Sequence, residues 1–343
     1  MSTSDETPGL DLSDLRVFLD RERPGLVAGE LRAEVIAGGR SNLTYDVTDG
    51  HDSWVVRRPP LGHVLATAHD MSREHRVISA LEPTDVPVPR TFVLCEDPDV
   101  LGAPFYVMEK VGGTPYRRAA QLEAIGAQRT RDICLRMVDI LGTLHEVDPE
   151  KVGLGDFGRP EGFLTRQVRR WKKQLDSSRS RDLAGMDDLH ARLEANVPEQ
   201  QAPAIVHGDY RLDNLLVDDS DRITAVLDWE MATVGDPLTD VALLVVYRGV
   251  AEQDRAGAVA DAPSAPGFLS TDEIVSRYAE RSGRDLSAMG FYLALAYFKL
   301  AVVLEGIHFR YTQGQTVGAG FEDVGRMVGP LVSAGLASLE RDG

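Results

Sequence analysis

The stretch VHGDYRLDNLLV, residues 206–217, decides the fold of this chain. An apolar segment leads into a polar loop that contains Asp209 and, five residues later, Asn214, and a second apolar segment follows at once. A polar loop held between two buried strands is a poor way to build a core and a good way to fix a functional site. The pattern therefore predicts a functional loop carried by two short strands.

A further carboxylate follows at the end of another apolar segment. The sequence VLDWE, residues 226–230, begins nine residues after Val217 and contains Asp228. Phosphoryl transfer needs one carboxylate to orient or deprotonate the acceptor hydroxyl, and hard oxygen ligands from Asn and Asp for Mg²⁺ on the nucleotide phosphates. Asp209, Asn214 and Asp228 supply that set of groups.

Together, HGDYRLDN and LDWE resemble the protein-kinase-like fold of the aminoglycoside phosphotransferase and choline kinase superfamily. The chain is most similar to the phosphotransferase domains that also occur fused to acyl-CoA dehydrogenases, which read alike through YRLDNLL, LDWE and GDPLTD (residues 235–240). The similarity covers roughly residues 31–336. It implies that Asp209 is the catalytic base, that Asn214 and Asp228 are Mg²⁺ ligands, and that ATP is the phosphoryl donor.

Other polar residues of these motifs are expected to be structural. His207 should brace the loop by hydrogen bonds, and Asp213 should cap or pair locally. Glu230 fits a supporting position near the metal ligands, while Asp236 and Asp240 should stabilise the loop and the start of the next helix.

The first third of the chain carries candidate nucleotide-binding residues. The segment AGGRSNLTY, residues 37–45, has the GGxSNxTY form of this superfamily, and Gly38, Gly39 and Ser41 are expected to approach phosphate oxygens. Arg57 occupies the strand where kinases keep a phosphate-binding Lys, and Arg can bind phosphate through two donors. Strand alternation places Arg57 and Arg58 on opposite faces; we choose Arg57.

Two more resemblances complete the expected nucleotide site. Glu74, on the only helix of this region, resembles the Glu that pairs with the basic strand residue. The segment FYVMEKVGG, residues 105–113, resembles the hinge that holds adenine, with main-chain groups of Glu109 and Val111 bonding the base.

The element pattern predicts an α+β, protein-kinase-like fold with two lobes. We expect a disordered tail (1–10), a β-rich nucleotide-binding lobe (11–108), a hinge (109–113) and a helical catalytic and substrate-binding lobe (114–343). Expected strands are 34–36, 44–48, 53–57, 92–95, 104–108, 204–207, 215–217 and 223–229. The first expected helix begins near Leu12. Further helices are expected at 66–81, 131–145, 161–175, 187–196, 271–282 and 288–310.

Composition excludes several classes of protein. The 343 residues exceed the ~100–200 of one domain, and 37 basic against 54 acidic residues give a net charge of −17. That balance argues against a nucleic-acid binder and against a polybasic membrane anchor. The runs 241–247 and 292–304 fall short of the ~20 residues that span a bilayer. Two scattered cysteines, with an acidic start to the chain, predict a cytoplasmic protein; no pattern specifies an oligomeric state.

The sequence therefore predicts an ATP- and Mg²⁺-dependent small-molecule kinase that phosphorylates a hydroxyl group. The resemblance to dehydrogenase-fused domains favours a hydroxyacyl-type acceptor over a cationic aminoglycoside. One alternative is a nucleotide-binding pseudokinase that acts as an interaction module. A protein kinase is least favoured, because the short span from Asp228 to Asp240 leaves little room for an activation loop.

Overall fold

The computed structural model describes residues 7–36, 42–61, 70–253, 261–315 and 321–340. The chain divides into two compact units. Unit 1 comprises residues 1–113 together with Thr224–Ala232, and unit 2 comprises Thr114–Ile223 together with residues 233–343. The segment Thr224–Ala232, which falls within the expected helical lobe, thus belongs to the β-rich unit.

Unit 1 is built on an antiparallel five-stranded sheet with the order β1-β2-β3-β5-β4. Its strands are β1 (Arg32–Val35), β2 (Leu43–Thr48), β3 (Ser53–Arg58), β4 (Thr91–Cys95) and β5 (Phe105–Glu109). All five lie within one or two residues of the expected ranges. The predicted Asp49-Gly50 turn joins β2 to β3, and Gly50 has a φ of +88°, which glycine adopts without strain.

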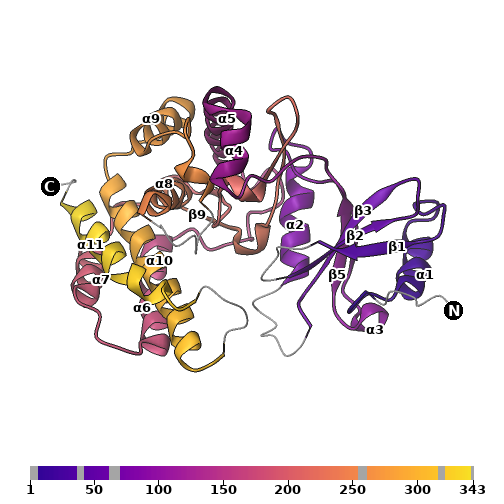
Figure 1. Cartoon of the computed structure of the whole chain (residues 1–343), viewed down its shortest axis with the longest axis horizontal. Helices are drawn as coiled ribbons and strands as arrows, with labels where there is room; N and C mark the ends of the chain where they lie inside the picture. Colours follow the sequence, from indigo (N-terminus) through magenta and orange to yellow (C-terminus); the bar gives the residue numbers. More distant parts are fainter. Residues whose placement is uncertain (1–6, 37–41, 62–69, 254–260, 316–320, 341–343) are drawn as a thin grey trace. The chain divides into compact units, whose positions relative to one another are not determined.

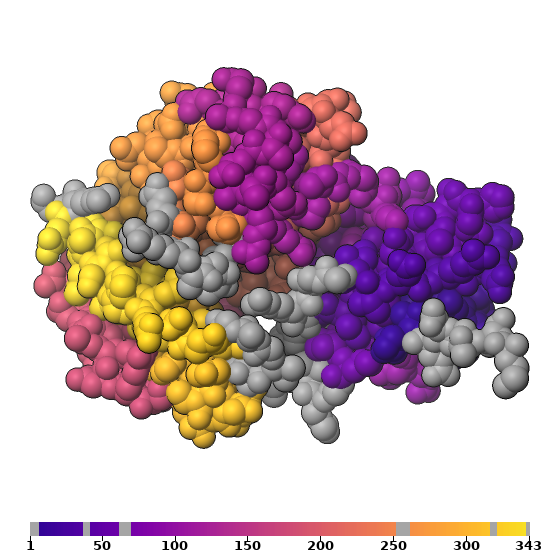
Figure 2. All heavy atoms as spheres, in the orientation of Figure 1, coloured from indigo at the N-terminus to yellow at the C-terminus, as the bar shows by residue number. Residues whose placement is uncertain are grey.

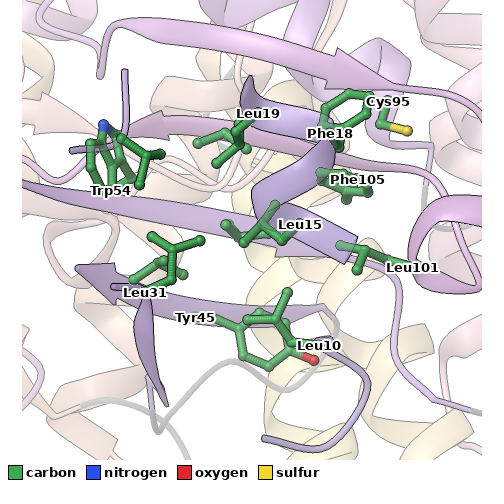
Figure 3. Packing of buried hydrophobic residues seen from close by; sticks show 14 residues of the cluster. Leu10, Leu15, Phe18, Leu19, Leu31, Tyr45, Trp54, Cys95, Leu101 and Phe105 are labelled. Carbon is green, nitrogen blue, oxygen red and sulfur yellow. The ribbon is translucent and has the colours of Figure 1, made fainter. Parts of the chain in front are cut away.

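One face of this sheet packs against α1 (Leu12–Glu22). The helix begins where the Asp11 side chain accepts hydrogen bonds from the amides of Ser13 (2.8 Å) and Asp14 (3.1 Å). Figure 3 shows the apolar face of α1 lying over the sheet. Phe18 meets Phe105 edge to face, with ring centroids 5.2 Å apart.

The opposite side chains of the sheet face α2 (Met71–Leu81), labelled beside the strands in Figure 1. The Asp70 side chain caps α2 by accepting from the Arg73 amide at 3.1 Å. The expected helix started at residue 66, and residues 66–69 lie outside the described part of the chain. Glu74 is buried on the inner side of α2, so a carboxylate faces the strand that carries Arg57.

The expected disordered tail differs from the structure at residues 7–10. Leu10 is buried in the core of unit 1, and the Tyr45 hydroxyl donates to the carbonyl of Pro8 at 2.6 Å. The apolar side chain of Leu10 thus extends the core. Residues 1–6 lie outside the described part.

Unit 2 is mainly helical. Its helices are α4 (Ala119–Ile125), α5 (Ala127–Glu146), α6 (Phe163–Ser178), α7 (Met186–Ala195), α8 (Leu238–Gln253), α9 (Thr271–Ser282), α10 (Met289–Thr312) and α11 (Val328–Leu339). Short strands β6 (Ala204–Val206) and β9 (Thr233–Gly235) pair antiparallel. The predicted functional loop lies between β6 and the short strand β7 (Leu215–Val217), as expected. In Figure 2 the yellow surface of α11 lies against the pink surface of α7.

Helix α8 is the helix expected to start beside Asp236 and Asp240, but its bounds were not predicted, although the sequence marks residues 241–247 as strongly apolar. Every residue from Val241 to Val246 is buried. A helix buried on all sides has no polar stripe, so the 3.6-residue period that reveals a helix is missing. The four-residue α3 (Pro98–Leu101), α4 and α11 lack a predicted counterpart.

Helix α10 is longer than its apolar run suggested. It has 24 residues and contains an 18-residue apolar window with a mean hydropathy of 1.6, so by length and composition alone it could cross a membrane. However, 72% of that apolar window is buried inside the protein. This is the expected composition of a central core helix, and α6, α7, α8 and α11 pack against it (Figure 1).

Phe105→Ala tests the core of unit 1. Phe105 is fully buried against Phe18, so its removal should lower the free energy of unfolding by roughly 3–5 kcal/mol, measured by urea denaturation. Val17→Ala, on the same helix as Phe18 but 68% exposed, should change it by less than about 0.5 kcal/mol. Equal losses in the two variants would contradict this packing.

Candidate active site

One buried carboxylate of α8 holds the backbone of the loop that follows β6. Asp240 accepts the backbone N–H of His207 at 2.6 Å and that of Gly208 at 2.8 Å. Gly208 has a φ of +84°, a conformation that favours glycine. The predicted stabilising role of Asp240 is therefore present as two hydrogen bonds to consecutive amides.

The same carboxylate is supported by α5 and α9. His145 Nε2 lies 3.4 Å from Asp240, and His145 Nδ1 lies 2.7 Å from the Tyr278 hydroxyl. Burial alone would raise the pKa of Asp240, but the hydrogen bonds from His145 and Gly208 bring that pKa below its ordinary value. Burial lowers the pKa of His145. Asp240 thus stays ionised in the interior of unit 2.

His207 braces the loop, as predicted. Its ring is fully buried, and its Nδ1 accepts the amide of Asp209 at 3.2 Å. Asp236, predicted to support the next helix, accepts the Leu238 amide at 3.1 Å and the Tyr292 hydroxyl at 2.8 Å.

Unit 2 brings the predicted base together with one predicted metal ligand. The Asn214 amide nitrogen donates to the Asp209 carbonyl at 2.9 Å and lies 3.3 Å from Asp209 Oδ2. Asp209 Oδ1 accepts a hydrogen bond from the Tyr247 hydroxyl at 2.7 Å. Sequence reasoning assigned Tyr247 no role; the available signal was its position seven residues after Asp240, two helical turns along the same face of α8.

Basic groups surround this loop within unit 2. Arg211 pairs with Asp213 (Nε to Oδ1, 2.6 Å), as the expected local pair, and its guanidinium lies 5.1 Å from the centre of the Tyr247 ring. Lys299 of α10 donates to the Gly208 carbonyl at 2.9 Å and lies 5.6 Å from the centre of the Trp171 ring. Burial lowers the pKa of Lys299, an effect that Asp209 and Asp240 oppose.

Unit 1 gathers two predicted residues, Glu74 and Asp228, around the guanidinium of a third, Arg57. Arg57 Nε lies 3.0 Å from Glu74 Oε1, and another nitrogen of Arg57 lies 2.6 Å from Asp228 Oδ1. The expected Arg57–Glu74 pair is therefore present. Arg58 points to the other face of the sheet, where it donates to the Leu101 carbonyl at 2.7 Å, so the two arginines lie on opposite faces, as alternation predicted.

Burial shifts the pKa values of both Glu74 and Arg57. It raises the pKa of Glu74 to about 7, against the opposing effect of Arg57. Burial would lower the pKa of Arg57, but the carboxylates of Glu74 and Asp228 raise it above its ordinary value. Arg57 is thus a permanent cation with two acidic partners.

The segment that carries Asp228 is fixed to unit 1 by its neighbours. The Val226 amide donates to the Pro87 carbonyl at 2.8 Å, and the Trp229 indole donates to the Val226 carbonyl at 3.0 Å. Asp228 itself has a φ of +66°, a left-handed conformation rare outside glycine. That turn ends β8 (Ile223–Val226) before the predicted limit at residue 229 and starts the short helix η2 (Trp229–Met231).

The expected supporting position of Glu230 has a structural counterpart. Glu230 accepts a hydrogen bond from the Asn42 side chain at 3.1 Å, which links the end of the predicted phosphate loop to the Asp228 segment within unit 1. Gly38, Gly39 and Ser41 themselves lie outside the described residues.

The hinge residues lie at the end of β5. The Glu109 amide donates to the Arg90 carbonyl at 2.8 Å, so this amide is already used and only other main-chain groups of Glu109 could bond a base. Val111 follows in a non-regular segment and is half-buried.

The donor chemistry of the predicted metal ligands fits Mg²⁺. Within the described ranges, no hydrogen bond is made to Asn214 Oδ1 or to Asp228 Oδ2, so each residue offers an oxygen. In the same ranges no cluster of three or more His, Cys, Asp or Glu side chains could hold a metal by itself. Mg²⁺ ordinarily takes only one or two protein oxygens, with phosphates and waters completing its shell.

Comparison with known proteins identifies the family to which the whole chain is similar. The profile of the phosphotransferase enzyme family matches residues 32–274. The chain is 33% identical to chicken acyl-CoA dehydrogenase family member 11 over 96% of its own length but 44% of that protein. It is 32% identical to a probable acyl-CoA dehydrogenase, IBR3, of Arabidopsis thaliana, covering 89% of this chain and 39% of that protein. The chain therefore spans less than half the length of these curated relatives.

Solved structures give the same result. A putative aminoglycoside phosphotransferase from Ralstonia eutropha JMP134 superimposes with a TM-score of 0.83 at 32% identity, covering 96% of this chain and 98% of that one. An aminoglycoside phosphotransferase, APH(4)-Ia, in ternary complex with AMP-PNP and hygromycin B matches with a TM-score of 0.61 at 16% identity, covering 95% and 98%. The latter shows the fold alone, which is protein-kinase-like as predicted.

Glu74→Gln tests the buried ion pair through pH. Folded Glu74 holds its proton up to about pH 7, whereas an unfolded Glu loses it near pH 4.5. The folded state therefore binds more protons across this window, and the free energy of unfolding should fall as the pH rises through it. The variant has no proton to exchange, so its urea-unfolding curve should lack this slope.

The matched control for that experiment is Glu22→Gln at an exposed position of α1. It should reproduce the pH dependence of the wild type. A wild-type protein whose stability between about pH 5 and about pH 7 follows that of Glu74→Gln would contradict the raised pKa.

Proposed function

The chain belongs to the phosphotransferase enzyme family and is a small-molecule kinase that acts on hydroxyl groups; we propose that it uses ATP and Mg²⁺ and that its acceptor is a hydroxyacyl-type metabolite. The observation that carries this proposal is the Asp209 carboxylate, held at the end of β6 on a loop whose backbone is fixed by Asp240.

The proposed reaction joins the acceptor oxygen to the γ-phosphorus of ATP and breaks the bond from that phosphorus to the β–γ bridging oxygen. ADP leaves, and the hydroxyl proton passes to the carboxylate of Asp209. Catalysis of this kind depends on positioning and on charge stabilisation. We assign Arg57 the contact with nucleotide phosphates.

Mg²⁺, when bound, neutralises phosphate charge and so favours transfer. We assign Asn214 and Asp228 as its protein ligands, because each presents an oxygen of the required type. The nucleotide contacts proposed for Gly38, Gly39, Ser41, Glu109 and Val111 rest on the family resemblance.

The charges around Asp209 within unit 2 support the proposed acceptor class. Lys299 and Arg211 both lie beside the loop: Arg211 pairs with Asp213, and Lys299 donates to the Gly208 carbonyl. A polycationic aminoglycoside would be repelled by such groups. An acceptor with an acyl carbonyl or an anionic group would be attracted to them.

Asp209→Asn tests the assigned base. The amide cannot accept the proton, so kcat should fall by roughly 10²–10⁴-fold, while the affinity for Mg·ADP is unchanged. Product formation is followed from ATP with hydroxyacyl thioesters and, in parallel, with aminoglycosides. Asp139→Asn, which removes a carboxylate paired with Arg277 on the same unit, is the control. Full turnover by Asp209→Asn would exclude the assigned role.

Asp228→Asn tests the nucleotide and metal site by thermal stability. At about 100 times its dissociation constant, Mg·ATP should stabilise the wild type by ~2.7 kcal/mol, seen as a rise in Tm. Asn tolerates the left-handed backbone at this position, so the variant should fold but lose the Mg-dependent part of the rise. Asp46→Asn, at a surface pair with Lys110 in the same unit, should keep it. An equal rise in both variants would contradict the assignment.

A further inference from the structure

We propose that Tyr247 is a positioning residue, whose hydroxyl fixes the orientation of the Asp209 carboxylate during phosphoryl transfer. The inference deepens the proposed function and rests on Asp209 being the base. It starts from the contact between the Tyr247 hydroxyl and Asp209 Oδ1, 2.7 Å long.

One helix holds both the backbone and the side chain of the loop. Asp240 and Tyr247 are seven residues apart on α8, so they lie on one face two turns from each other. Asp240 holds the amides of His207 and Gly208, and Tyr247 holds the carboxylate of Asp209. Because both come from one rigid element, the carboxylate is fixed relative to its own backbone.

The chemistry makes Tyr247 a lasting donor to this carboxylate. Burial raises the pKa of Tyr247, and the charge of Asp209 raises it further, so the phenol keeps its proton. A hydrogen bond from a hydroxyl to an ionised carboxylate belongs to the stronger class. The bond therefore restrains rotation of the Asp209 side chain more than a neutral contact would.

The Tyr247 ring is itself held in place. The guanidinium of Arg211 lies over the ring at 5.1 Å, and Arg211 is fixed by its double hydrogen bond to Asp213. Leu244 and Phe268 line a small pocket together with Tyr247. The ring thus has a charged neighbour on its face and apolar neighbours beside it.

This arrangement leaves Asp209 able to act. Each carboxylate oxygen can accept about two hydrogen bonds. Tyr247 occupies one position on Oδ1, while Oδ2 makes one long contact of 3.3 Å, with Asn214, among the residues that the structure describes. Oδ2 can therefore accept a hydrogen bond from an acceptor hydroxyl while Tyr247 stays in place.

Tyr247→Phe removes the hydroxyl and keeps the ring that contacts Arg211. We expect kcat to fall about 10-fold, while the KM for ATP and the Tm shift with Mg·ADP stay unchanged. This split between kcat and nucleotide binding distinguishes a positioning role from a general loss of structure. A kcat within about 2-fold of an active wild type would overturn the proposal.

The matched control is Tyr292→Phe. Its hydroxyl also donates to a carboxylate of unit 2, Asp236, at 2.8 Å, but that carboxylate supports the start of α8 and does not touch Asp209. The variant should lose stability at least as much as Tyr247→Phe and keep kcat within about 2-fold. An equal fall of kcat in both variants would overturn a specific role for Tyr247.

A double-mutant cycle separates this inference from the proposed function. The free energies of unfolding of wild type, Tyr247→Phe, Asp209→Asn and the double variant should be non-additive, because the two side chains share one bond. Additive losses would overturn the proposal whether or not the protein is active. A wild type without turnover or nucleotide-induced shift would instead contradict the proposed function, and the cycle would still decide whether Tyr247 restrains Asp209.

Discussion

The buried carboxylate of Asp240 is the constraint on which unit 2 depends. An ionised group shielded from water is tolerated only when its oxygens accept hydrogen bonds. Both oxygens of Asp240 do so, from consecutive amides of the loop after β6 and from His145 of α5. One carboxylate on α8 therefore joins segments far apart in sequence, and Tyr278 extends the network to α9. The backbone at Asp209 is fixed before any contact of its own side chain is considered.

Each unit holds one of the charged groups assigned to the reaction in a fixed position, a guanidinium in unit 1 and a carboxylate in unit 2. Unit 1 holds the cation Arg57 between two carboxylates, those of Glu74 and Asp228. Unit 2 holds the carboxylate of Asp209, with Lys299 and Arg211 beside its loop. In phosphoryl transfer the protein itself does little covalent chemistry; it accelerates the reaction mainly by holding charged groups in the right positions. In unit 1 the ion pairs of Arg57 fix the position of its charge. In unit 2 the hydrogen bonds of Asp240 fix the loop that carries Asp209.

The sequence predicted those parts of the fold and site that depend on short-range pattern. Alternation along β3 placed Arg57 and Arg58 on opposite faces, and the motif with Asp209 and Asn214 predicted one loop that carries both residues. The extent of helix α8 was not predicted, because every residue from Val241 to Val246 is buried and this part of the helix therefore has no amphipathic period. Tyr247 was missed because its partner lies 38 residues away in sequence. Only the folded chain shows that an apparently ordinary aromatic residue meets the Asp209 carboxylate.

The most direct test of the account is a search for the phosphorylated product. Purified protein is incubated with Mg·ATP and a set of hydroxyacyl thioesters and aminoglycosides, and mass spectrometry records which compound gains one phosphoryl group. We expect the wild type, and not Asp209→Asn, to phosphorylate a hydroxyacyl thioester. A product that Asp209→Asn forms as fast as the wild type would contradict it.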